Sequence, residues 1–532
     1  MAADLPELRQ HIVQYLDFDT LKTFSLVCKA WYLDAYAILW KHFSCKAPWE
    51  NPASSEGYPF WLDTVRQNAH SFKHIYNMEY NERTPEIGNL LLDRCHGLVS
   101  IDGAVTMIDI QDPGRYWEET LRPLVEQNKA SMRRLQLRTM KGSLMASLQL
   151  PSLLASLSHL RSLELYVMRM DVEDLLPVLD ACSSSLERLD LRPHICREDR
   201  TQGNSVTCHP PTTTATSLRL KRLYMASCNA KIVDDVLSRL AAHSLEKLHL
   251  ETLFRLPSSS KPRDALWRLT HLCLENIRPI SALPQILDAI QPHQLRYVRL
   301  GSIDTECSTK LIEQQHRSLE FLNVQLIYRH TEALADILAT CRKLKVLVFT
   351  APPIVDIQTL IDPQRPWLCT ELEVFGGCFL LPSRPSLPSN SNEVDDTESS
   401  RQIGKAFMQR LGQLTKLRSL AQDVNRRGFT HRDVKLELEI MTWSLSSGLM
   451  YMTGLVNLQS LRFLDRDLPK GVGIPEMEFI KRHWRNLQEL ECYEIKDAEV
   501  QHWLEVEWPE LKVKTKQLAS GRLTQVLWPP LE

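Results

Sequence analysis

The chain has little of what marks a secreted or membrane protein. Its 532 residues contain no run of about 20 apolar residues, the length that spans a bilayer, and the start MAADLPELRQ lacks the basic and apolar regions of a signal peptide. No Asn stands two places before a Ser or Thr, so the sequence has no N-glycosylation site. We therefore expect a cytoplasmic or nuclear protein with no membrane partner.

The 13 cysteines lack the spacing of disulfide frameworks and zinc sites. Their number is odd and they are scattered singly, which suits a reducing compartment where buried Cys acts as a small hydrophobic residue. The pairs His194/Cys196 and Cys208/His209 are only distantly similar to a metal site, because neither is a C-x-x-C knuckle. We expect these to be loop residues, and we expect no metal and no other cofactor.

Motifs of the common enzyme classes are missing as well. Gly471 and Gly473 lack the third glycine and the Lys-Ser/Thr of a phosphate loop, and neither H-E-x-x-H nor G-x-S-x-G occurs. A catalytic cysteine cannot be chosen among single residues without a local motif or a base. We expect a protein that is not an enzyme; the enzyme alternative would need a pocket with strongly perturbed carboxylates or histidines.

Neither sign of charge dominates. The 63 basic and 65 acidic residues nearly cancel, which removes any overall electrostatic attraction to nucleic acid. With 43% hydrophobic and 24% charged residues, the composition is that of an ordinary folded protein. At 532 residues the chain is too long for one ordinary core, so it must split into domains or grow by repetition.

What the sequence does have is a repeated apolar triplet with the spacing L-x-x-L-x-L. Between Leu220 and Leu344 successive triplets follow one another by 24 to 26 residues. The last two apolar residues of each should point inward from a short strand, because strand side chains alternate between faces. The clearest copies begin at Leu160, Leu186, Leu220, Leu245, Leu269, Leu295, Leu319 and Leu344, and weaker copies begin at Phe72, Leu98, Met132, Leu372, Leu417, Leu458 and Leu487.

The rest of each unit is predicted to be a helix. Residues 171–182, 232–242 and 331–341 carry apolar residues at helical spacing. This pattern resembles the leucine-rich-repeat family, and its cysteine-containing branch, since Cys182 and Cys341 close a helix just before the next triplet. The resemblance implies an α/β solenoid, a horseshoe with parallel strands on the concave face and helices outside. Unrelated leucine-rich helices are the alternative.

One repeat position departs from the family. Where Asn or Cys usually follows the triplet, only Cys228 fits. The other repeats carry the apolar residues Met168, Leu253, Ile277, Ile303 and Ile327. We therefore expect an apolar seam at this position instead of a buried polar ladder.

Three segments interrupt the repeats. Residues 201–217 and 257–264 are rich in Ser, Thr and Pro, and residues 382–400 have the composition of a disordered segment. We expect all three to be loops that leave the solenoid. The third contains Thr397 and Ser399 beside acidic residues, so it is either a phosphorylated loop or only a solvated insertion.

The first 46 residues do not fit the repeat. Their apolar residues predict three short helices, each with an apolar stripe. The stripe of the first helix contains Leu8, Ile12 and Leu16. So small a module cannot bury these stripes alone, so it must pack on the repeats or on a partner. We expect residues 47–70 to be a linker and residues 71–532 to form the solenoid.

This N-terminal segment resembles an F-box in Leu5-Pro6, Ile12, Leu16, Leu21, Val27-Cys28-Lys29, Trp31 and Leu39-Trp40. The resemblance implies docking to the Skp-type adaptor of a cullin-RING, SCF-type ubiquitin ligase core. The positions carried over as adaptor contacts are Leu5, Pro6, Leu8, Ile12, Leu16, Leu21, Val27 and Trp31. The alternative, which is compatible with docking, is that the helices cap the open edge of the first repeat.

The strand surface is a candidate binding site for a second protein. The residues before the second apolar position of the triplets form a column that changes from basic to aromatic: Arg134, Ser162, Arg188, Arg222, Lys247, His271, Tyr297 and Phe321. We hypothesise that Arg188, Arg222, Lys247, Tyr297 and Phe321 bind a protein segment with acidic or phosphorylated residues beside an apolar anchor. The alternative is that the charges only maintain solubility, and Glu164, Asp190, Glu251 and Glu275 compensate part of them.

The two resemblances together imply a substrate-recognition adaptor of an SCF-type ubiquitin ligase. The module would fix the chain to the ligase core, while the repeats hold an unknown protein substrate near the site of transfer. The alternative is a leucine-rich-repeat scaffold for protein–protein interaction that does not lead to degradation.

Overall fold

The structure is a computed structural model. It describes residues 6–13, 15–16, 18–45, 58–79, 84–105, 116–139, 148–167, 172–182, 184–193, 217–228, 230–251, 263–275, 283–303, 305–326, 331–349, 355–377, 379–380, 394–423, 443–464, 472–492 and 494–515. The chain divides into two compact units. The first contains Met1–Leu253 and Pro257–Leu266, and the second contains Phe254–Leu256 and Trp267–Glu532.

The first unit begins with three short helices, as the sequence predicts. They are α1 (Pro6–Val13), α2 (Phe18–Ser25) and α3 (Lys29–Leu39). Val13, Leu21 and Ala35 form their small buried core. After α3 the chain enters β1 (His42–Ser44), which pairs in parallel with β2 (His74–Glu79). The end of the helical module is therefore also a strand of the sheet.

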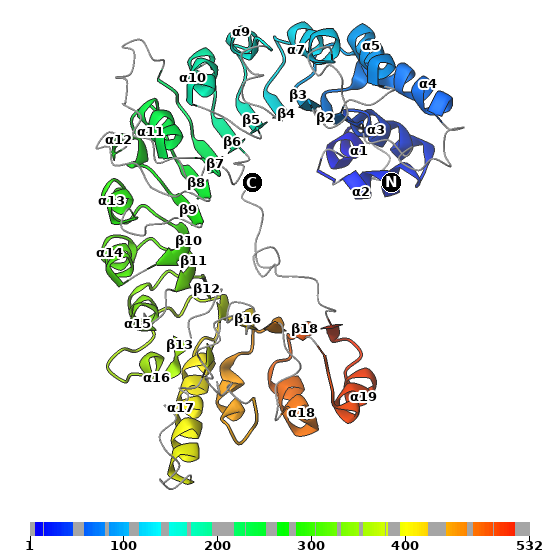
Figure 1. The fold of residues 1–532 in the computed structure, drawn as a ribbon. Coiled ribbons are helices and arrows are strands. Elements are labelled where there is room, and N and C mark those ends of the chain that lie inside the picture. The colour runs from blue at the N-terminus through cyan, green and yellow to red at the C-terminus, as the bar shows by residue number, and fades with distance from the viewer. Residues whose placement is uncertain are drawn as a thin grey trace. The chain divides into compact units, whose positions relative to one another are not determined.

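The remainder of the first unit repeats a strand followed by a helical segment. Each strand pairs in parallel with the next one in chain order, and the helices lie together on one side of the sheet (Figure 1). The strands are β3 (Ser100–Val105), β4 (Arg134–Thr139), β5 (Ser162–Val167), β6 (Arg188–Pro193), β7 (Arg222–Ala226) and β8 (Lys247–Glu251). The helices are α4 (Tyr58–Asn68), η4 (Ala69–Ser71), α5 (Thr84–Arg94), the π-helix η5 (Trp117–Leu121), α7 (Arg122–Gln127), α9 (Leu150–Ser156), α10 (Val172–Ala181), α11 (Ala230–Ser238) and α12 (Arg263–Leu266).

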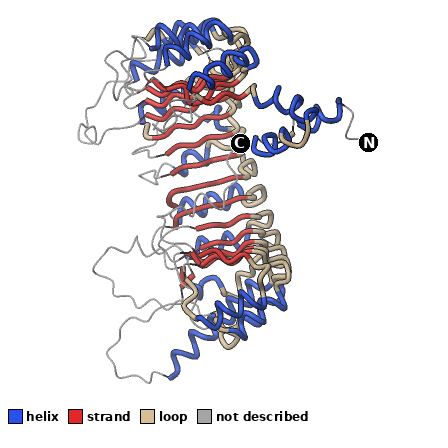
Figure 2. The backbone as a smooth tube through the Cα atoms, turned by 90° about the vertical axis from the view of Figure 1, so that its right-hand side faces the viewer, coloured by secondary structure: helices blue, strands red, loops and turns tan. Residues whose placement is uncertain are grey.

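The second unit is built in the same way. Its successive strands pair in parallel, one beside the next (Figure 2). These strands are β9 (His271–Glu275), β10 (Tyr297–Ile303), β11 (Phe321–Leu326), β12 (Val346–Phe349), β14 (Val374–Gly377), β16 (Ser419–Asp423), β17 (Ser460–Leu464), β18 (Glu489–Cys492) and β19 (Lys512–Thr515). A separate short pair joins β13 (Val355–Asp356) to β15 (Phe379–Leu380).

Helices connect the strands of the second unit and lie together on one side of its sheet (Figure 1). They are α13 (Leu283–Asp288), α14 (Thr305–Gln315), α15 (Thr331–Thr340), α16 (Ile357–Leu360), α17 (Val394–Gly412), η9 (Leu449–Gly454), α18 (Ile474–His483) and α19 (Ala498–Glu507). Among the described helices, none combines the length and apolar character that a membrane crossing needs.

The apolar triplets form the core of both units. Leu186, Leu189 and Leu191 are at most 1% exposed, and each of the other predicted triplets likewise begins with a buried residue. On β5 and β6 the leucines that point into the core are buried, and Glu164 and Asp190, which stand between them on the other face, are buried as well. The predicted solenoid of strand–helix repeats is therefore confirmed.

Buried thiol and amide side chains stand where a helix turns toward the next strand. The Sγ atom of Cys182 donates to the Val178 carbonyl at 3.2 Å. In the equivalent turn, Asn128 Oδ1 accepts from the Leu98 N–H at 2.9 Å. These bonds satisfy backbone groups that would otherwise be buried without partners. The polar residues of this solenoid therefore stand before the triplet in these repeats.

The position after the triplet is described in only part of the repeats. Cys228 and Ile303 are both 0% exposed, and Ile303 fits the expected apolar seam. The other residues of that seam, Met168, Leu253, Ile277 and Ile327, lie outside the described residues.

The segments expected to be loops or linker are partly described. Residues 201–216, 257–262 and 382–393 of the expected insertions lie outside the described residues, and α12 and α17 begin directly after the second and third of these stretches. Thr397 and Ser399 lie on α17. Within the expected linker, residues 58–68 form α4, which packs on the first repeat because Leu62 and Val65 on its inner face are buried.

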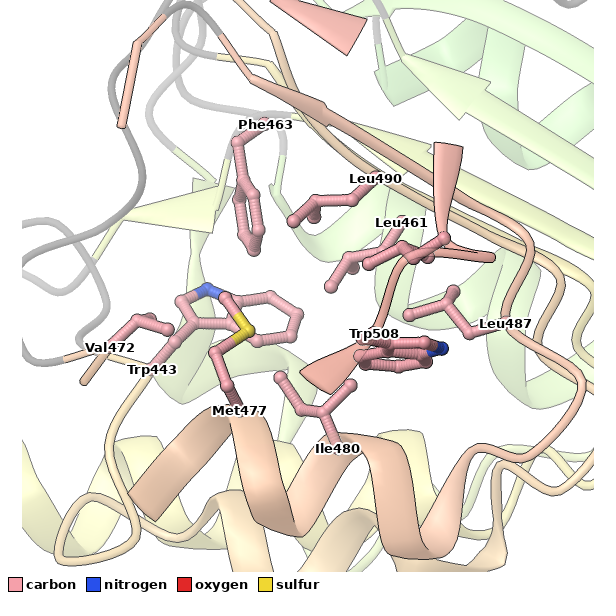
Figure 3. Close-up of a pocket in the computed structure, with 10 residues that line it drawn as sticks. Trp443, Leu461, Phe463, Val472, Met477, Ile480, Leu487, Leu490 and Trp508 are labelled. Carbon is pink, nitrogen blue, oxygen red and sulfur yellow. The ribbon is translucent and has the colours of Figure 1, made fainter. Parts of the chain in front are cut away.

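One small cavity lies inside the second unit, among the last repeats (Figure 3). Its walls are apolar side chains of the core, with Met477 and Ile480 of α18 facing Phe463 and Leu490 across it. Trp508 closes one side. A cavity with such walls offers no polar group to a ligand, so it is a feature of packing and not a binding site.

Candidate protein-binding surfaces

The helical module exposes a set of large apolar side chains. Leu26 is 85% exposed and Val27 is 64% exposed, in the turn that joins α2 to α3. We call the exposed apolar residues of the module the module surface: Leu8, Tyr15, Leu26, Val27, Tyr32 and Leu33. Scattered single apolar residues are normal on a protein surface, but a group of this size on so small a module is typical of an interaction site.

The residues predicted to contact an adaptor do not all lie on this surface. Pro6, Leu8 and Val27 are exposed, while Ile12, Leu16 and Trp31 are half-buried. Leu21 is only 4% exposed, because it belongs to the core that holds the three helices together. It can support the surface from beneath but does not lie on it. Leu5 lies outside the described residues.

The residue pattern missed Tyr15, Leu26, Tyr32 and Leu33. On α3 the buried stripe runs through Trp31, Ala35, Ile38 and Leu39, so the neighbouring Tyr32 and Leu33 must point elsewhere. That spacing alone could have identified them. Leu26 could have been found too, since it stands beside Val27 at the end of a helix that already has its core residues.

The module is attached to the first repeat by aromatic stacking and a hydrogen bond. Phe43 of β1 stacks on Phe72, with ring centroids 4.6 Å apart and an angle of 9° between the rings. The hydroxyl of Tyr36 on α3 donates to Asn68 Oδ1 of α4 at 2.9 Å. The module therefore covers the edge of β2, as the capping alternative expects, and still leaves the module surface open.

A second candidate surface is the strand face of the first unit, the side of its sheet opposite the helices. The strand register places one residue from each of β1 to β8 in a single row, which we call the basic column: His42, His74, Ser100, Arg134, Ser162, Arg188, Arg222 and Lys247. No member of this row is acidic. Arg188, Arg222 and Lys247, predicted to bind a substrate, are direct neighbours in it.

Buried carboxylates lie beside the basic column and take up part of its charge. Glu164, with a side chain 3% exposed, lies 2.9 Å from Arg134 Nη2 and 3.5 Å from Arg188 Nη2. Asp190, with a side chain 1% exposed, accepts two hydrogen bonds of 2.9 Å from Arg192. Such bidentate pairs are among the stronger ion pairs in proteins. They fix the arginines in place on the strand face.

Two tyrosines complete this arrangement. The Arg192 guanidinium lies 4.8 Å from the ring centre of Tyr166 and 4.3 Å from that of Tyr224. Burial lowers the pKa of Arg192, but the hydrogen bonds and charge of Asp190 raise it overall. The Tyr224 hydroxyl donates to Glu251 Oε2 at 2.6 Å, and burial together with this bond raises the pKa of Tyr224. Both groups therefore keep their protons at neutral pH.

Arg222 stands apart from these pairs. It is exposed, and no described carboxylate lies within ion-pair distance of it. Its neighbours in register are Arg188 and Lys247. Burial and the charge of Arg222 lower the pKa of Lys247. Positive charge is therefore concentrated and only partly compensated on β6, β7 and β8.

The strand face of the second unit is aromatic instead. Tyr297 and Phe321, the other two predicted substrate contacts, stack with ring centroids 4.1 Å apart and an angle of 13°. His271 stacks on Tyr297 at 5.4 Å. Val346 and Val374 continue this row on the next two strands. The five predicted contacts thus fall into one cationic group in the first unit and one aromatic group in the second.

Several buried cysteines are held in the thiol form. Burial raises the pKa of the Cys95 and Cys182 thiols to about 12, and it raises that of Cys341 to about 11. These thiols stay protonated at neutral pH, whereas the thiolate is the nucleophile and metal ligand. Their place in the turns before the triplets gives them a packing role.

One protein-family model matches the N-terminal residues of the chain. Residues 3–33 match the family model described as F-box domain. The chain therefore carries an F-box domain, as its residues predicted. Among solved structures, a chain of the crystal structure of the Rad7 and Elc1 complex in yeast aligns with 65% of this chain and 89% of its own, at 14% identity and a TM-score of 0.33. The curated proteins contain no match to the sequence.

Proposed function

We propose that the protein is a substrate-recognition adaptor of an SCF-type ubiquitin ligase in the cytoplasm or nucleus. The F-box domain docks on the Skp-type adaptor of the ligase core, and the strand faces of the repeats hold a protein substrate. The observation that carries this proposal is the exposure of the module surface. The F-box domain keeps this surface exposed although its helix α3 is bonded to α4 of the repeats.

Docking follows from the free energy of burying the module surface. Covering a Leu or Val side chain contributes roughly 1.5–3 kcal/mol before the costs of association. Leu26 and Val27 are the most exposed aliphatic residues in the described part of the module, so they have the most to gain from a partner. Their position in a short turn places both at one point, as expected for the centre of an interface.

The adaptor itself needs no reactive groups. F-box proteins are typically adaptors and not enzymes, and ubiquitin transfer occurs elsewhere in the ligase. Holding the substrate near the transfer site raises the effective concentration of its lysines there. The parallel sheet with its buried core supplies what tethering requires, a stable surface connected to the docking module through β1.

The decisive experiment compares two exposed valines in the full chain. Val27→Asp places a charge on the module surface, while Val506→Asp places one on α19 at a residue of similar exposure, 58%. Affinity for a purified Skp-type adaptor, measured by calorimetry, should fall at least about tenfold for the first variant and stay unchanged for the second. Absence of binding by the unchanged protein would overturn the proposal.

A second measurement separates a ligase adaptor from a scaffold. Proteins captured by the full chain and by its Val27→Asp variant are compared by mass spectrometry, and the half-lives of the captured proteins are followed in cells. We expect ligase subunits to be lost with the variant and substrates to be kept but stabilised. Partners whose half-lives do not respond to the variant would favour the scaffold alternative.

A further inference from the structure

Basic side chains gather at the turns that lead into the first strands. The residues immediately before β1, β2, β4 and β5 and one further residue of the turn before β4 are basic. We call these residues the turn surface: Lys41, Lys73, Arg133, Arg161 and Lys129. The turns before β2, β3, β4 and β5 contain no Asp or Glu, at residues 69–73, 95–99, 128–133 and 157–161. Positive charge therefore accumulates here without a carboxylate in the same turns.

The backbone fixes the spacing of the turn surface. The Lys41 carbonyl accepts from the Lys73 N–H at 2.9 Å and from the His74 N–H at 2.8 Å. The Arg133 carbonyl likewise accepts from the Arg161 N–H at 2.8 Å. Neighbouring strands lie about 4.8 Å apart, so the row from β1 to β5 spans roughly 19 Å. Because exposed charges act on one another within about 10 Å at 0.1 M salt, these cations produce one common positive field.

The charge of the turn surface is not compensated within the described part of the chain. Lys41, Lys129 and Arg161 are exposed, and no described carboxylate lies within ion-pair distance of any of them. The next turns of the first unit differ, because there Lys221 pairs with Glu187 at 3.2 Å. The uncompensated stretch therefore ends at β6, where Glu187 stands at the position that Arg161 has before β5.

The turn surface adjoins the F-box domain. Only Trp40 separates Lys41 from the end of α3. Figure 2 shows the helical module on the side of the first unit where the strands begin, which is also the side of the turn surface. A protein that covers the module surface therefore lies near these cations. The module surface itself is apolar, so it offers a partner burial but no opposite charge.

We propose that the protein that docks on the module presents acidic residues to the turn surface, so that one partner covers both surfaces. This inference rests on the proposed function, in which the partner is a Skp-type adaptor. The turn surface attracts and orients the partner before the apolar contact with the module surface forms. Attraction between opposite charges raises association rates about 10- to 1000-fold, and it weakens as salt is added.

A nucleic acid fits the turn surface less well. The row of cations extends for only roughly 19 Å before Glu187 interrupts it. The chain carries a formal charge of −2, so no wider field extends the attraction. A phosphate backbone also has no apolar group to place on the adjoining module surface. A protein supplies apolar and acidic side chains together, which is the usual composition of an interface core and its rim.

The test measures the association and dissociation rates of a purified Skp-type adaptor with the full chain at low and at high salt. The turn-surface variant combines three exposed changes: Lys41→Glu, Lys129→Glu and Arg161→Glu. Its association rate at low salt should fall at least about tenfold, with little change in the dissociation rate, because charges outside the apolar contact act mainly on encounter. The difference should shrink at high salt, where the field is screened.

A matched control reverses the same amount of charge in turns of the second unit: Arg296→Glu, Arg342→Glu and Lys343→Glu, all at exposed residues. This control should associate as fast as the unchanged protein. Melting temperatures show whether the variants stay folded. Arg161→Glu alone, which should slow association roughly twofold to fivefold, replaces the triple variant if that variant unfolds.

The outcomes separate this inference from the proposed function. A normal association rate for the turn-surface variant, or equal slowing by the control, would overturn the inference and leave the ligase function standing. The same conclusion follows if the turn-surface changes abolish binding of single-stranded RNA and leave association of the adaptor unaffected. No binding of the adaptor by the unchanged protein would overturn both.

Discussion

The helical module and the repeats use the same apolar residue types with opposite results. Leu189 in β6 is 0% exposed, whereas Leu26 in the module is 85% exposed. Each strand inside the repeats has a neighbour on both sides and helices behind it, so its leucines are covered by the chain itself. The described part of the module has three helices with a buried core of Val13, Leu21 and Ala35, against which the half-buried Leu16, Trp31, Ile38 and Leu39 pack.

This difference separates the residues that stabilise the chain from those that stay exposed. A solenoid stabilises itself by stacking each unit on its neighbours. A module with so few buried side chains contributes little to stability, and its uncovered side chains are available to a partner. Substitution of equivalent residues in the two regions should therefore change different quantities.

The largest effect is expected from leucine truncation. Leu189→Ala should lower the free energy of unfolding by about 2–5 kcal/mol, because it leaves a cavity in a closed core. Leu26→Ala should change it by less than about 0.5 kcal/mol. Both are measured by denaturant unfolding of the full chain. Equal destabilisation by the two variants would remove the distinction between the regions.

Removal of a buried ion pair should have the next largest effect on the free energy of unfolding. Asp190→Asn removes a carboxylate that Arg192 holds with two bonds, and we expect a loss of about 1–3 kcal/mol, reduced by solvent because the Arg192 side chain is 38% exposed. Asp34→Asn in the module breaks the pair with Arg9 at 2.9 Å and should cost less, about 0.5–1.5 kcal/mol. A larger effect of Asp34→Asn in thermal unfolding would contradict this order.

Removal of the hydrogen bond between the module and the first repeat should have a smaller effect on stability. Tyr36→Phe removes the hydroxyl that donates to Asn68 and should destabilise the attachment of the module by about 0.5–1.5 kcal/mol. Hydrogen exchange should then quicken in α1 to α3 and remain unchanged in β5 and β6. Tyr32→Phe, on the same helix but on the module surface, serves as the control.

The smallest effect is expected from pH. His42 and His74 stack at the joint, 4.6 Å apart. Burial lowers the pKa of both; the charge of Lys41 adds to this for His42, and those of His42, Arg134 and Lys41 add to it for His74. The unfolded chain then binds more protons than the folded one below the ordinary value of 6.5, so stability should fall as pH drops through that value. His42→Gln with His74→Gln should flatten this slope in unfolding experiments between neutral and mildly acidic pH.

The sequence predicts the repeats well because two independent signals agree. The interval of 24 to 26 residues gives the units, and the period of two within each triplet gives the buried side of the strands. Leu186, Leu189 and Leu191 are buried as that pattern requires. The column of Arg188, Arg222 and Lys247 follows from the same register.

The module and the details of the strand face were harder to predict. When apolar residues stand on several sides of a short helix, the pattern cannot tell which side forms the core, and so it predicts Leu21 as a contact although Leu21 is buried. β1 has no triplet and only three residues. The position of Arg192 between Tyr166 and Tyr224 depends on side chains from three strands, which no single segment of sequence reveals.

The short strand β1 has a practical consequence for anyone who dissects the protein. It occupies the edge of β2 through a parallel pairing from His42↔His74 to Ser44↔Tyr76. A fragment cut after residue 46 would present that edge with unpaired N–H and C=O groups, the arrangement that recruits strands from other molecules. Such a fragment should self-associate, and any loss of partner binding in it would be confounded with aggregation.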